Sequence, residues 1–267
     1  AWLITFDKLL SETKFPELIQ KILDKLKKVY QYPVDIEFTL NIDENHNFKI
    51  NLLQCRPLQT NKEKITDTVP KSLDNGKKVF YSKGNFMGGN FLLNVSKVIY
   101  VDFENYCKLA KNNKHRIARL IGKLNNEIGK KEDESIVLIG PGRWGSAMPS
   151  LGVPVNFSEI NYIKVLIEIA ANEKNMTPEL SFGSHFYQDL VENNILYVAL
   201  FPKKNGCIFN SSHLKNYTNK LGEYFKQKIT NKYRDILKVY DFNKDRKFTI
   251  NSDIISREVQ GVIVTSL

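Results

Sequence analysis

Cysteine is scarce in this chain, and its spacing excludes the common metal and disulfide frameworks. The 267 residues contain three cysteines, Cys55, Cys107 and Cys207, which are odd in number and far apart. Zinc fingers and thiol redox motifs need two cysteines close together in the sequence. We therefore expect no structural zinc. We also expect a reduced, cytoplasmic protein, because structural disulfides belong to oxidising compartments.

Long hydrophobic runs are missing as well. No stretch approaches the roughly 20 apolar residues that a membrane-spanning helix needs. The first residues, from Ala1 to Phe6, lack a starting Met and lack the basic-then-apolar layout of a signal peptide. These observations predict a protein without a membrane partner. They also suggest that the chain is part of a longer protein.

Acidic residues are outnumbered by basic ones, and the formal net charge is +10. The lysines are scattered through helical stretches, and no recognisable nucleic-acid-binding module accompanies them. A solvated basic surface is therefore the preferred interpretation, and we expect no nucleic-acid partner. A basic surface would also suit nucleotide or phosphate ligands. Retention on a polyanion beyond the effect of net charge would be needed to revive the nucleic-acid alternative.

The first 60 residues have patterns that predict a helix and a hairpin. Residues 16–30 repeat apolar side chains at helical spacing, with lysines on the other face. Residues 34–40 alternate strictly between apolar and polar side chains, as a half-buried strand does. A polar turn at residues 43–47 separates them from a second strand at 48–57, and we expect the two strands to pair.

The rest of the chain predicts an α/β domain. We place a polar linker at residues 61–77 and a mixed α/β domain at residues 78–267. Strands and helices alternate in this domain, which is typical of α/β architecture. Strands are expected at 79–82, 97–102, 135–139, 162–170, 195–201, 248–250 and 261–266. Helices are expected at 104–130, directly after His185, and from Ser212 to about Val239, with Ser212 as its cap.

The predicted hairpin carries the first set of residues that could perform chemistry. Asp35 and Glu37 lie two residues apart and so share one face of their strand, as do Gln54 and Arg56 on the next. Two carboxylates and a carboxamide oxygen are ligands that Mg²⁺ accepts. A neighbouring arginine can neutralise phosphate charge during phosphoryl transfer. The ordinary alternative is the polar outer face of a hairpin.

A resemblance enters with Asp35-Ile-Glu-Phe-Thr and Leu53-Gln-Cys-Arg-Pro57. These two motifs, in this order, resemble the end of the nucleotide-binding domain of pyruvate phosphate dikinase and phosphoenolpyruvate synthase. The resemblance implies an ATP-grasp fold for residues 1–60. It also implies that Glu37 and Gln54 bind the metal with ATP and that Arg56 contacts the phosphates. The family's upstream lysine and glycine-rich phosphate loop have no counterpart here, so we expect the chain alone to be inactive.

A second motif is Leu138-Ile-Gly-Pro-Gly-Arg-Trp-Gly-Ser146, followed by Leu151-Gly-Val-Pro154. A strand that ends in a glycine-rich turn can bring backbone N–H groups close to a ligand, and Arg143 could hold an anion. Trp144 could stack on a ligand ring or pack in the core. The spacing fits neither a P-loop nor a dinucleotide fingerprint. A structural loop is an equal alternative, although the motifs together resemble the C-terminal region of some phosphoenolpyruvate-synthase-like proteins.

The third motif is Gly183-Ser-His185, which stands where a helical pattern begins. A helix start presents unpaired N–H groups and the positive end of the helix dipole, which favour phosphate. In the dikinase family a swivelling domain carries a phosphorylated histidine just before a helix. The resemblance implies that role for His185, although Phe186 and Tyr187 replace the family's small residues. Anion binding without phosphorylation, or a structural histidine, are the alternatives.

The combined prediction is part of an ATP-dependent phosphotransferase that uses ATP and Mg²⁺. The resemblance makes His185 and Arg56 the catalytic candidates, and Glu37, Gln54 and Arg56 the candidates for ligand binding. Arg143 is a further candidate for ligand binding, from its place in the glycine-rich turn. Pyruvate or another small phosphoryl acceptor is the implied second substrate. The alternative is a non-catalytic regulatory or partner-binding α/β module. The sequence leaves the acceptor and the oligomeric state open.

Overall fold

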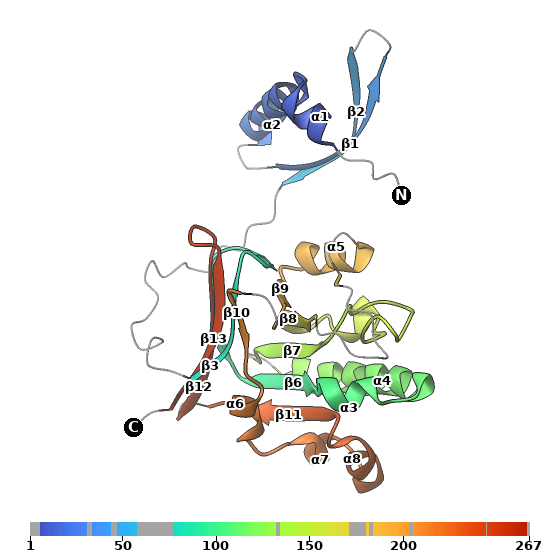
Figure 1. The fold of residues 1–267 in the computed structure, drawn as a ribbon, viewed down its shortest axis with the longest axis vertical. Coiled ribbons are helices and arrows are strands. Elements are labelled where there is room, and N and C mark those ends of the chain that lie inside the picture. The colour runs from blue at the N-terminus through green and yellow to red at the C-terminus, as the bar shows by residue number, and fades with distance from the viewer. Residues whose placement is uncertain are drawn as a thin grey trace. The chain divides into compact units, whose positions relative to one another are not determined.

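The structure of the chain, a computed structural model, is shown in Figure 1. It describes residues 6–30, 34–43, 47–57, 77–131, 134–170, 180–181, 184–202, 205–243 and 245–265. The side chains of Asp35, Arg56, Pro57, His185 and Thr265 lie outside this description, and so does Gly183. The chain divides into two compact units, residues 1–60 and 61–267, which are described separately.

The first unit consists of two helices and a two-stranded hairpin. A short helix α1 (Asp7–Ser11) precedes α2 (Phe15–Tyr30), and strands β1 (Val34–Ile42) and β2 (Phe48–Pro57) follow. Phe15 at the start of α2 packs its ring near those of Phe38 and Phe48, with centroids 6.0 and 6.2 Å away. The apolar stripe of α2 is half-buried up to Leu26, whereas Val29 is exposed.

The hairpin forms as predicted, with one irregularity. β1 and β2 pair antiparallel, and Ile42 lies opposite Phe48 next to the turn. Half-buried and exposed side chains alternate along β1, as its sequence pattern indicates. The register shifts between Glu37 and Phe38, because Glu37 pairs with Gln54 but Phe38 pairs with Leu52. Leu53 is therefore the extra residue of a β-bulge, and its side chain is exposed.

The second unit is built on a six-stranded sheet. Its strands run in the order β11-β6-β7-β8-β9-β4. The four central strands are parallel, and each edge strand is antiparallel to its neighbour. Their bounds are β4 Phe86–Met87, β6 Lys97–Val101, β7 Ile136–Pro141, β8 Ile163–Ile169, β9 Leu196–Leu200 and β11 Leu237–Asp241. The central strands are buried on both faces, which explains their continuous apolar sequences.

A five-stranded antiparallel sheet covers one face of this central sheet. Its order is β10-β3-β13-β12-β5. The bounds are β3 Lys77–Lys83, β5 Phe91–Val95, β10 Cys207–Phe209, β12 Arg246–Asp253 and β13 Glu258–Thr265. One apolar cluster joins both sheets and includes Phe80, Tyr100, Ile139 and Phe248. Gly261 lies at a register shift of β13, where a Cβ atom would come 2.2 Å from the ring of Phe80.

Helices cover the other face of the central sheet, so the unit has three layers (Figure 1). They are α3 Phe103–Cys107, α4 Lys111–Gly129, α5 His185–Glu192, α7 Leu221–Tyr224 and α8 Gln227–Tyr233, with a short 3-10 turn η2 at Phe157–Glu159. The short helix α6 (Ser212–Lys215) instead packs against β3 and buries Leu214 in the cluster between the two sheets. α4 buries Ile117, Ile121, Leu124 and Ile128, which the helical spacing predicts. The predicted α/β class is confirmed. Among the described helices, none is long and apolar enough to span a membrane.

Two predicted helices are wrong in extent. The helix expected at 104–130 is divided into α3 and α4, because the chain is extended at Ala110 and Leu109 turns back to Tyr106. The helix expected from Ser212 to about Val239 is replaced by three short helices and the edge strand β11. There Asn219 accepts the N–H groups of Leu221 and Val239, which ties the segment to β11. The hydrogen bond from Val239 joins residues 20 positions apart in the sequence, so helical periodicity does not reveal it.

Candidate functional site

The predicted metal and nucleotide residues of the first unit lie on one face of the hairpin. Glu37 stands directly opposite Gln54, and Asp35 stands opposite Arg56. Directly opposed residues on an antiparallel pair have neighbouring side chains. The side chains of Glu37 and Gln54 are exposed. Thr39 and Asn51 continue the same face, and the amide of Asn51 donates to Oγ1 of Thr39 at 3.1 Å.

The bulge at Leu53 decides this arrangement. Phe48, Ile50 and Leu52 of β2 alternate with polar residues, and Gln54 would share their face if the strand were regular. The extra residue turns Gln54 to the face of Glu37 instead. Bulges are frequent next to functional sites, where they re-aim a side chain. The bulge thus places the carboxylate of Glu37 in β1 and the carboxamide of Gln54 in β2 on the same face of the hairpin.

The donor chemistry of this face fits a hard cation. Carboxylate and carboxamide oxygens, such as those of Glu37 and Gln54, are the ligand types that Mg²⁺ accepts. Among the described side chains, no group of three or more His, Cys, Asp or Glu residues is placed to hold a metal ion.

The other sequence motifs meet in the second unit, at the carboxyl edge of the parallel strands. The loop after β7 carries Gly142 to Ser146, and the segment after β8 leads to His185 at the start of α5. The strands β6, β7, β8 and β9 are parallel, so their carboxyl ends share one edge. Ligands of open α/β sheets bind outside this edge.

Backbone contacts give the loop after β7 its shape. Gly142 and Gly145 have positive φ angles of 62° and 72°, which glycine adopts without steric cost. The N–H of Arg143 donates to the carbonyl of Leu151 at 2.8 Å, and that of Gly145 donates to Val153 at 3.2 Å. The GPGRWGS and LGVP motifs therefore form one folded-back loop. Arg143 is half-buried within it.

Glu168 of β8, which the sequence analysis missed, is the buried centre of this edge. Its Oε1 accepts the backbone N–H of Trp144 at 2.9 Å, and its Oε2 accepts that of Ser181 at 2.8 Å. The hydroxyls of Tyr197 and Ser181 donate to the same carboxyl at 2.6 and 2.5 Å. One side chain therefore ties the loop after β7 to the segment before α5 and to β9.

The ionisation of Glu168 is set by opposing effects. Burial raises the pKa of this carboxyl, while hydrogen bonds from Ser181, Tyr197 and Trp144 act in the opposite direction. Burial also raises the pKa of Tyr197, followed by the charge of Glu168, so its hydroxyl stays a donor. The available sequence signal was a single acidic residue near the end of an apolar strand, at residues 163–169. Buried acids of this kind need partners, which the sequence does not identify.

The start of α5 packs directly against the loop after β7. A Cβ atom on Gly145 would lie 2.3 Å from the ring of Phe186, so the two are in close contact. Ser184 caps the helix by accepting the N–H of Tyr187 at 3.2 Å. The backbone of His185 is thus placed beside the GPGRWGS loop, while its side chain lies outside the described residues.

Trp144 packs in the core rather than facing a ligand. Its side chain is fully buried, close to Gly140. The indole N–H has no hydrogen-bond partner among the described residues. Of the two interpretations of Trp144, packing is therefore the one that the structure supports.

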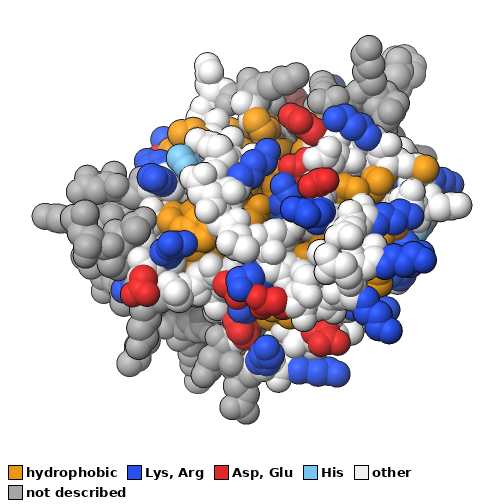
Figure 2. Space-filling view, turned by 90° about the horizontal axis from the view of Figure 1, so that it is seen from below, with side chains coloured by type: hydrophobic (Ala, Val, Ile, Leu, Met, Phe, Trp, Pro, Cys, Tyr) orange, Lys and Arg blue, Asp and Glu red, His pale blue; other side chains and the backbone are white. Residues whose placement is uncertain are grey.

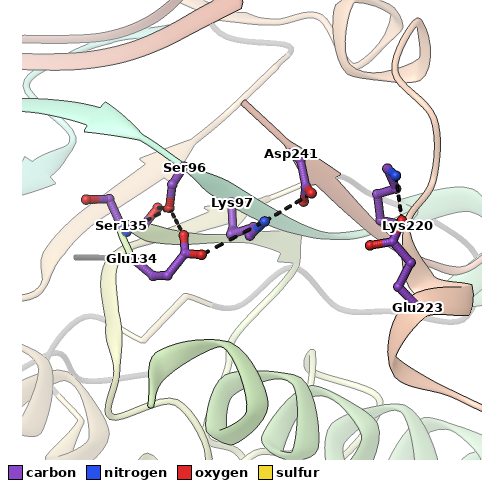
Figure 3. A network of polar contacts seen from close by, with 7 residues as sticks. All are labelled: Ser96, Lys97, Glu134, Ser135, Lys220, Glu223 and Asp241. Carbon is purple, nitrogen blue, oxygen red and sulfur yellow. Dashed lines mark hydrogen bonds and ion pairs between the residues drawn. The ribbon is translucent and has the colours of Figure 1, made fainter. Parts of the chain in front are cut away.

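A polar network lies at the opposite, amino edge of the central sheet (Figure 3). The ammonium of Lys97 lies 3.0 Å from Asp241 and 4.0 Å from Glu134, which also accepts the hydroxyl of Ser96. Burial works to lower the pKa of Lys97, but the hydrogen bond and charge of Asp241, with the charge of Glu134, raise it overall. These contacts join β6 to β11 and to the segment before β7. Their role is to fix strand ends.

The surface charge is dispersed over the face shown in Figure 2. Lys and Arg side chains are spread across it, with Asp and Glu side chains among them and apolar patches between. Some surface charges of the chain are paired, such as Lys220 with Glu223 at 2.5 Å. On the face shown in Figure 2, the basic side chains are spread rather than concentrated in one stripe.

These features define an α/β protein with an exposed acid–amide pair on one hairpin and a glycine-rich loop beside a histidine-starting helix. Residues 7–77 match the family of the pyruvate phosphate dikinase AMP/ATP-binding domain. This match bears out the resemblance for the first part of the chain, which is similar to the AMP/ATP-binding domain of pyruvate phosphate dikinase. No curated protein and no solved structure matches the chain.

Proposed function

We propose that the chain is part of an ATP-dependent phosphotransferase of the dikinase type. The observation that carries the proposal is the pairing of Glu37 with Gln54 inside the segment that matches the AMP/ATP-binding domain. The two side chains are exposed on one face, as ligands of a metal–nucleotide complex need to be. In this proposal residues 1–60 are the end of an ATP-grasp domain.

Each residue of the hairpin face has a role in the proposal. Glu37 and Gln54 offer oxygen atoms to Mg²⁺, which would shield the charge of the ATP phosphates when bound. Arg56 shares their face, because it is opposite Asp35 and two residues after Gln54. Its guanidinium would contact the phosphates as a planar donor of several hydrogen bonds.

In the second unit, we assign the phosphoryl-relay role to His185. It is the first residue of α5, where the helix dipole and free N–H groups favour a phosphate. Its backbone lies beside the loop that carries Arg143, a candidate anion contact. The relay would take the phosphoryl group from ATP and pass it to pyruvate or another small acceptor. The unit then corresponds to a swivelling domain.

One observation favours a non-catalytic second unit. Phe186 replaces a small residue of the family pattern and packs closely on Gly145, while Glu168 fixes the same loop from within the core. A helix start whose Phe186 packs so closely on the loop also suits a regulatory module that kept the fold without the chemistry. The two candidates differ in whether His185 is ever phosphorylated.

Nucleotide binding tests the first unit. Calorimetric titration measures the affinity of the full-length native protein for ATP in the presence of Mg²⁺. Glu37→Gln and Arg56→Gln are each expected to bind ATP at least about tenfold more weakly than the wild type. Lys49→Gln is the matched control, because Lys49 is an exposed cation on the same strand face next to the turn. Equal affinity in the three variants and the wild type would contradict the site.

Phosphoryl trapping tests the second unit. The full-length protein would be incubated with Mg²⁺ and ATP labelled separately at the β and γ phosphates, and acid-labile phosphate would be mapped under neutral conditions. Label on His185 that is lost in His185→Ala but kept in His115→Ala would support the relay. Bound ATP without any histidine label would favour the non-catalytic alternative.

A further inference from the structure

A pocket of about 340 Å³ lies between the start of α4 and the loop after β7. Its lining includes Lys111 and Lys114 from the first turn of the helix, Cys107 from α3, and Pro149 and Ser150 from the loop. The volume lies at the lower end of the range of small-molecule sites. None of these residues takes part in the function proposed above.

Lys114 is the unusual member of this lining, because it is a buried cation. It is 4% exposed, and lysine is rarely so enclosed without a partner of opposite charge. Its ammonium lies 3.4 Å from the carbonyl of Pro149 and 5.1 Å from the ring centre of Tyr106. Among the described residues, no carboxylate forms an ion pair with it.

The helix start around Lys114 is also locally unfavourable in the absence of an anion. The cap position, Ala110, has no side-chain oxygen for the free N–H groups, and the first turn contains no acidic residue. Lys111 and Lys114 instead place two positive charges at the positive end of the helix dipole. Local rules of this kind are usually broken where a ligand compensates.

The environment already disfavours the charged form of Lys114. Burial lowers the pKa of its ammonium, and the nearby Cys107 thiol has the opposite and smaller influence. A bound anion would stabilise the ammonium and remove this penalty. The hydroxyl of Ser150 and the helix N–H groups add hydrogen-bond donors that suit a tetrahedral anion.

We propose that this pocket binds the phosphate group of a small phosphorylated molecule. Lys114 would supply the buried charge, Lys111 a second charge at the rim, and Ser150 a hydrogen bond. Lysine is a common phosphate ligand, which it binds as a point charge. The pocket is larger than one phosphate, which leaves room for the rest of a small molecule.

The test is calorimetric titration of the full-length native protein with inorganic phosphate at constant ionic strength. Lys114→Met keeps the buried stem and removes the charge, so phosphate binding is expected to weaken at least about tenfold. Lys123→Met, an exposed lysine farther along the same helix, is the matched control and should leave binding unchanged. Acetate and ATP are titrated in parallel.

Thermal unfolding separates a binding lysine from a structural one. Without phosphate, the Tm of Lys114→Met is expected to equal or exceed that of the wild type, because an unpaired buried cation is lost. A purely structural lysine predicts a lower Tm and an unchanged affinity for phosphate, which would overturn the proposal. Ser150→Ala, which leaves Lys114 in place, should weaken binding about threefold or more.

Three further outcomes support or contradict the phosphate site at Lys114. No phosphate binding by the wild type, or binding that Lys114→Met leaves unaltered, contradicts the site. Acetate that binds as tightly as phosphate contradicts the assignment to phosphate. ATP binding that depends on Glu37 but not on Lys114 supports the separate nucleotide site, so the two proposals can fail independently.

Discussion

The two candidate sites are built in opposite ways. On the hairpin of the first unit, Glu37 and Gln54 are exposed, and their positions follow from strand pairing. At the carboxyl edge in the second unit, the buried Glu168 fixes the loop after β7 and the segment before α5. Its carboxyl is fully buried and accepts four hydrogen bonds. The first site presents side chains, whereas the second depends on a buried scaffold.

This difference indicates at which of the two sites a substitution can change ligand binding without changing the stability of the fold. An exposed pair on a hairpin contributes little to folding, so its substitution should affect ligands alone. A buried carboxyl that satisfies several donors cannot be changed without exposing unpaired groups to an apolar core. The four predictions below test this contrast, from the largest expected effect to the smallest.

Glu168→Gln is expected to have the largest effect, a loss of about 2–6 kcal/mol in the free energy of unfolding, because the backbone N–H and the hydroxyl that share one carboxyl oxygen would each lose an acceptor at about 1–3 kcal/mol. Each carboxyl oxygen accepts a backbone N–H, so the amide nitrogen of glutamine would face one of these donors. Urea unfolding followed by the fluorescence of buried Trp144 measures the change. Glu127→Gln, on the exposed face of α4, is the control, and equal stability of both variants would contradict the role of Glu168.

Gly145→Ala should destabilise the second unit by about 2–4 kcal/mol, because it adds backbone strain and a clash. The residue has a φ of 72°, and a Cβ atom would lie 2.3 Å from the ring of Phe186. Gly84→Ala provides the comparison, since Gly84 has a φ of 77° with nothing within 4 Å of the added atom. The difference between the two unfolding free energies isolates the contact with Phe186; no difference would exclude it.

Insertion of one residue between Glu37 and Phe38 tests the bulge. The inserted residue would pair with Leu53 and make both strands regular, which would turn Glu37 and Gln54 to the face of Phe38, at a cost of roughly 1–3 kcal/mol for polar groups on a half-buried face. Hydrogen exchange of the hairpin amides should increase, and affinity for Mg²⁺ and ATP should fall. Leu53→Ala, which keeps the residue count, should leave both unchanged; retained affinity after the insertion would contradict the register argument.

Glu37→Gln is expected to change the stability of the protein by less than about 0.5 kcal/mol, because the side chain is exposed. Hydrogen exchange of the strand amides measures this. A large loss of protection would mean that Glu37 supports the hairpin itself, and the contrast between the two sites would then disappear.

Much of the hairpin could be predicted from the sequence because its signals are local. The alternation at residues 34–40, the polar turn and the apolar second strand each lie within about ten residues. The helical stripe of α4 is local too, and Ile117 to Ile128 are buried as expected. The helix predicted at 104–130 was wrong in its continuity, because the chain is extended at Ala110 between α3 and α4. Tyr106, just before this break, donates its hydroxyl to the carbonyl of Gly152 in the loop after β7, a contact that local spacing does not reveal.

The second site could be predicted only in part. Its motifs were visible as Arg143 in a glycine-rich turn and His185 before a helix, but the contact of Gly145 with Phe186 joins residues 41 positions apart. The partners of Glu168 come from three separate segments, and the charge of Lys114 is unusual only because the fold encloses it. None of these contacts produces a periodic pattern in the sequence from which it could be predicted.

The sequence by itself determined the α/β class, most strands and the similarity of residues 7–77 to the pyruvate phosphate dikinase AMP/ATP-binding domain, because apolar periodicity and short motifs are properties of neighbouring residues. The tertiary structure decided the face on which Gln54 lies, the burial of Glu168 and the pocket at Lys114. Each of these depends on which distant segments pack together. Side-chain direction and desolvation arise from that packing, so they are set only when the chain folds.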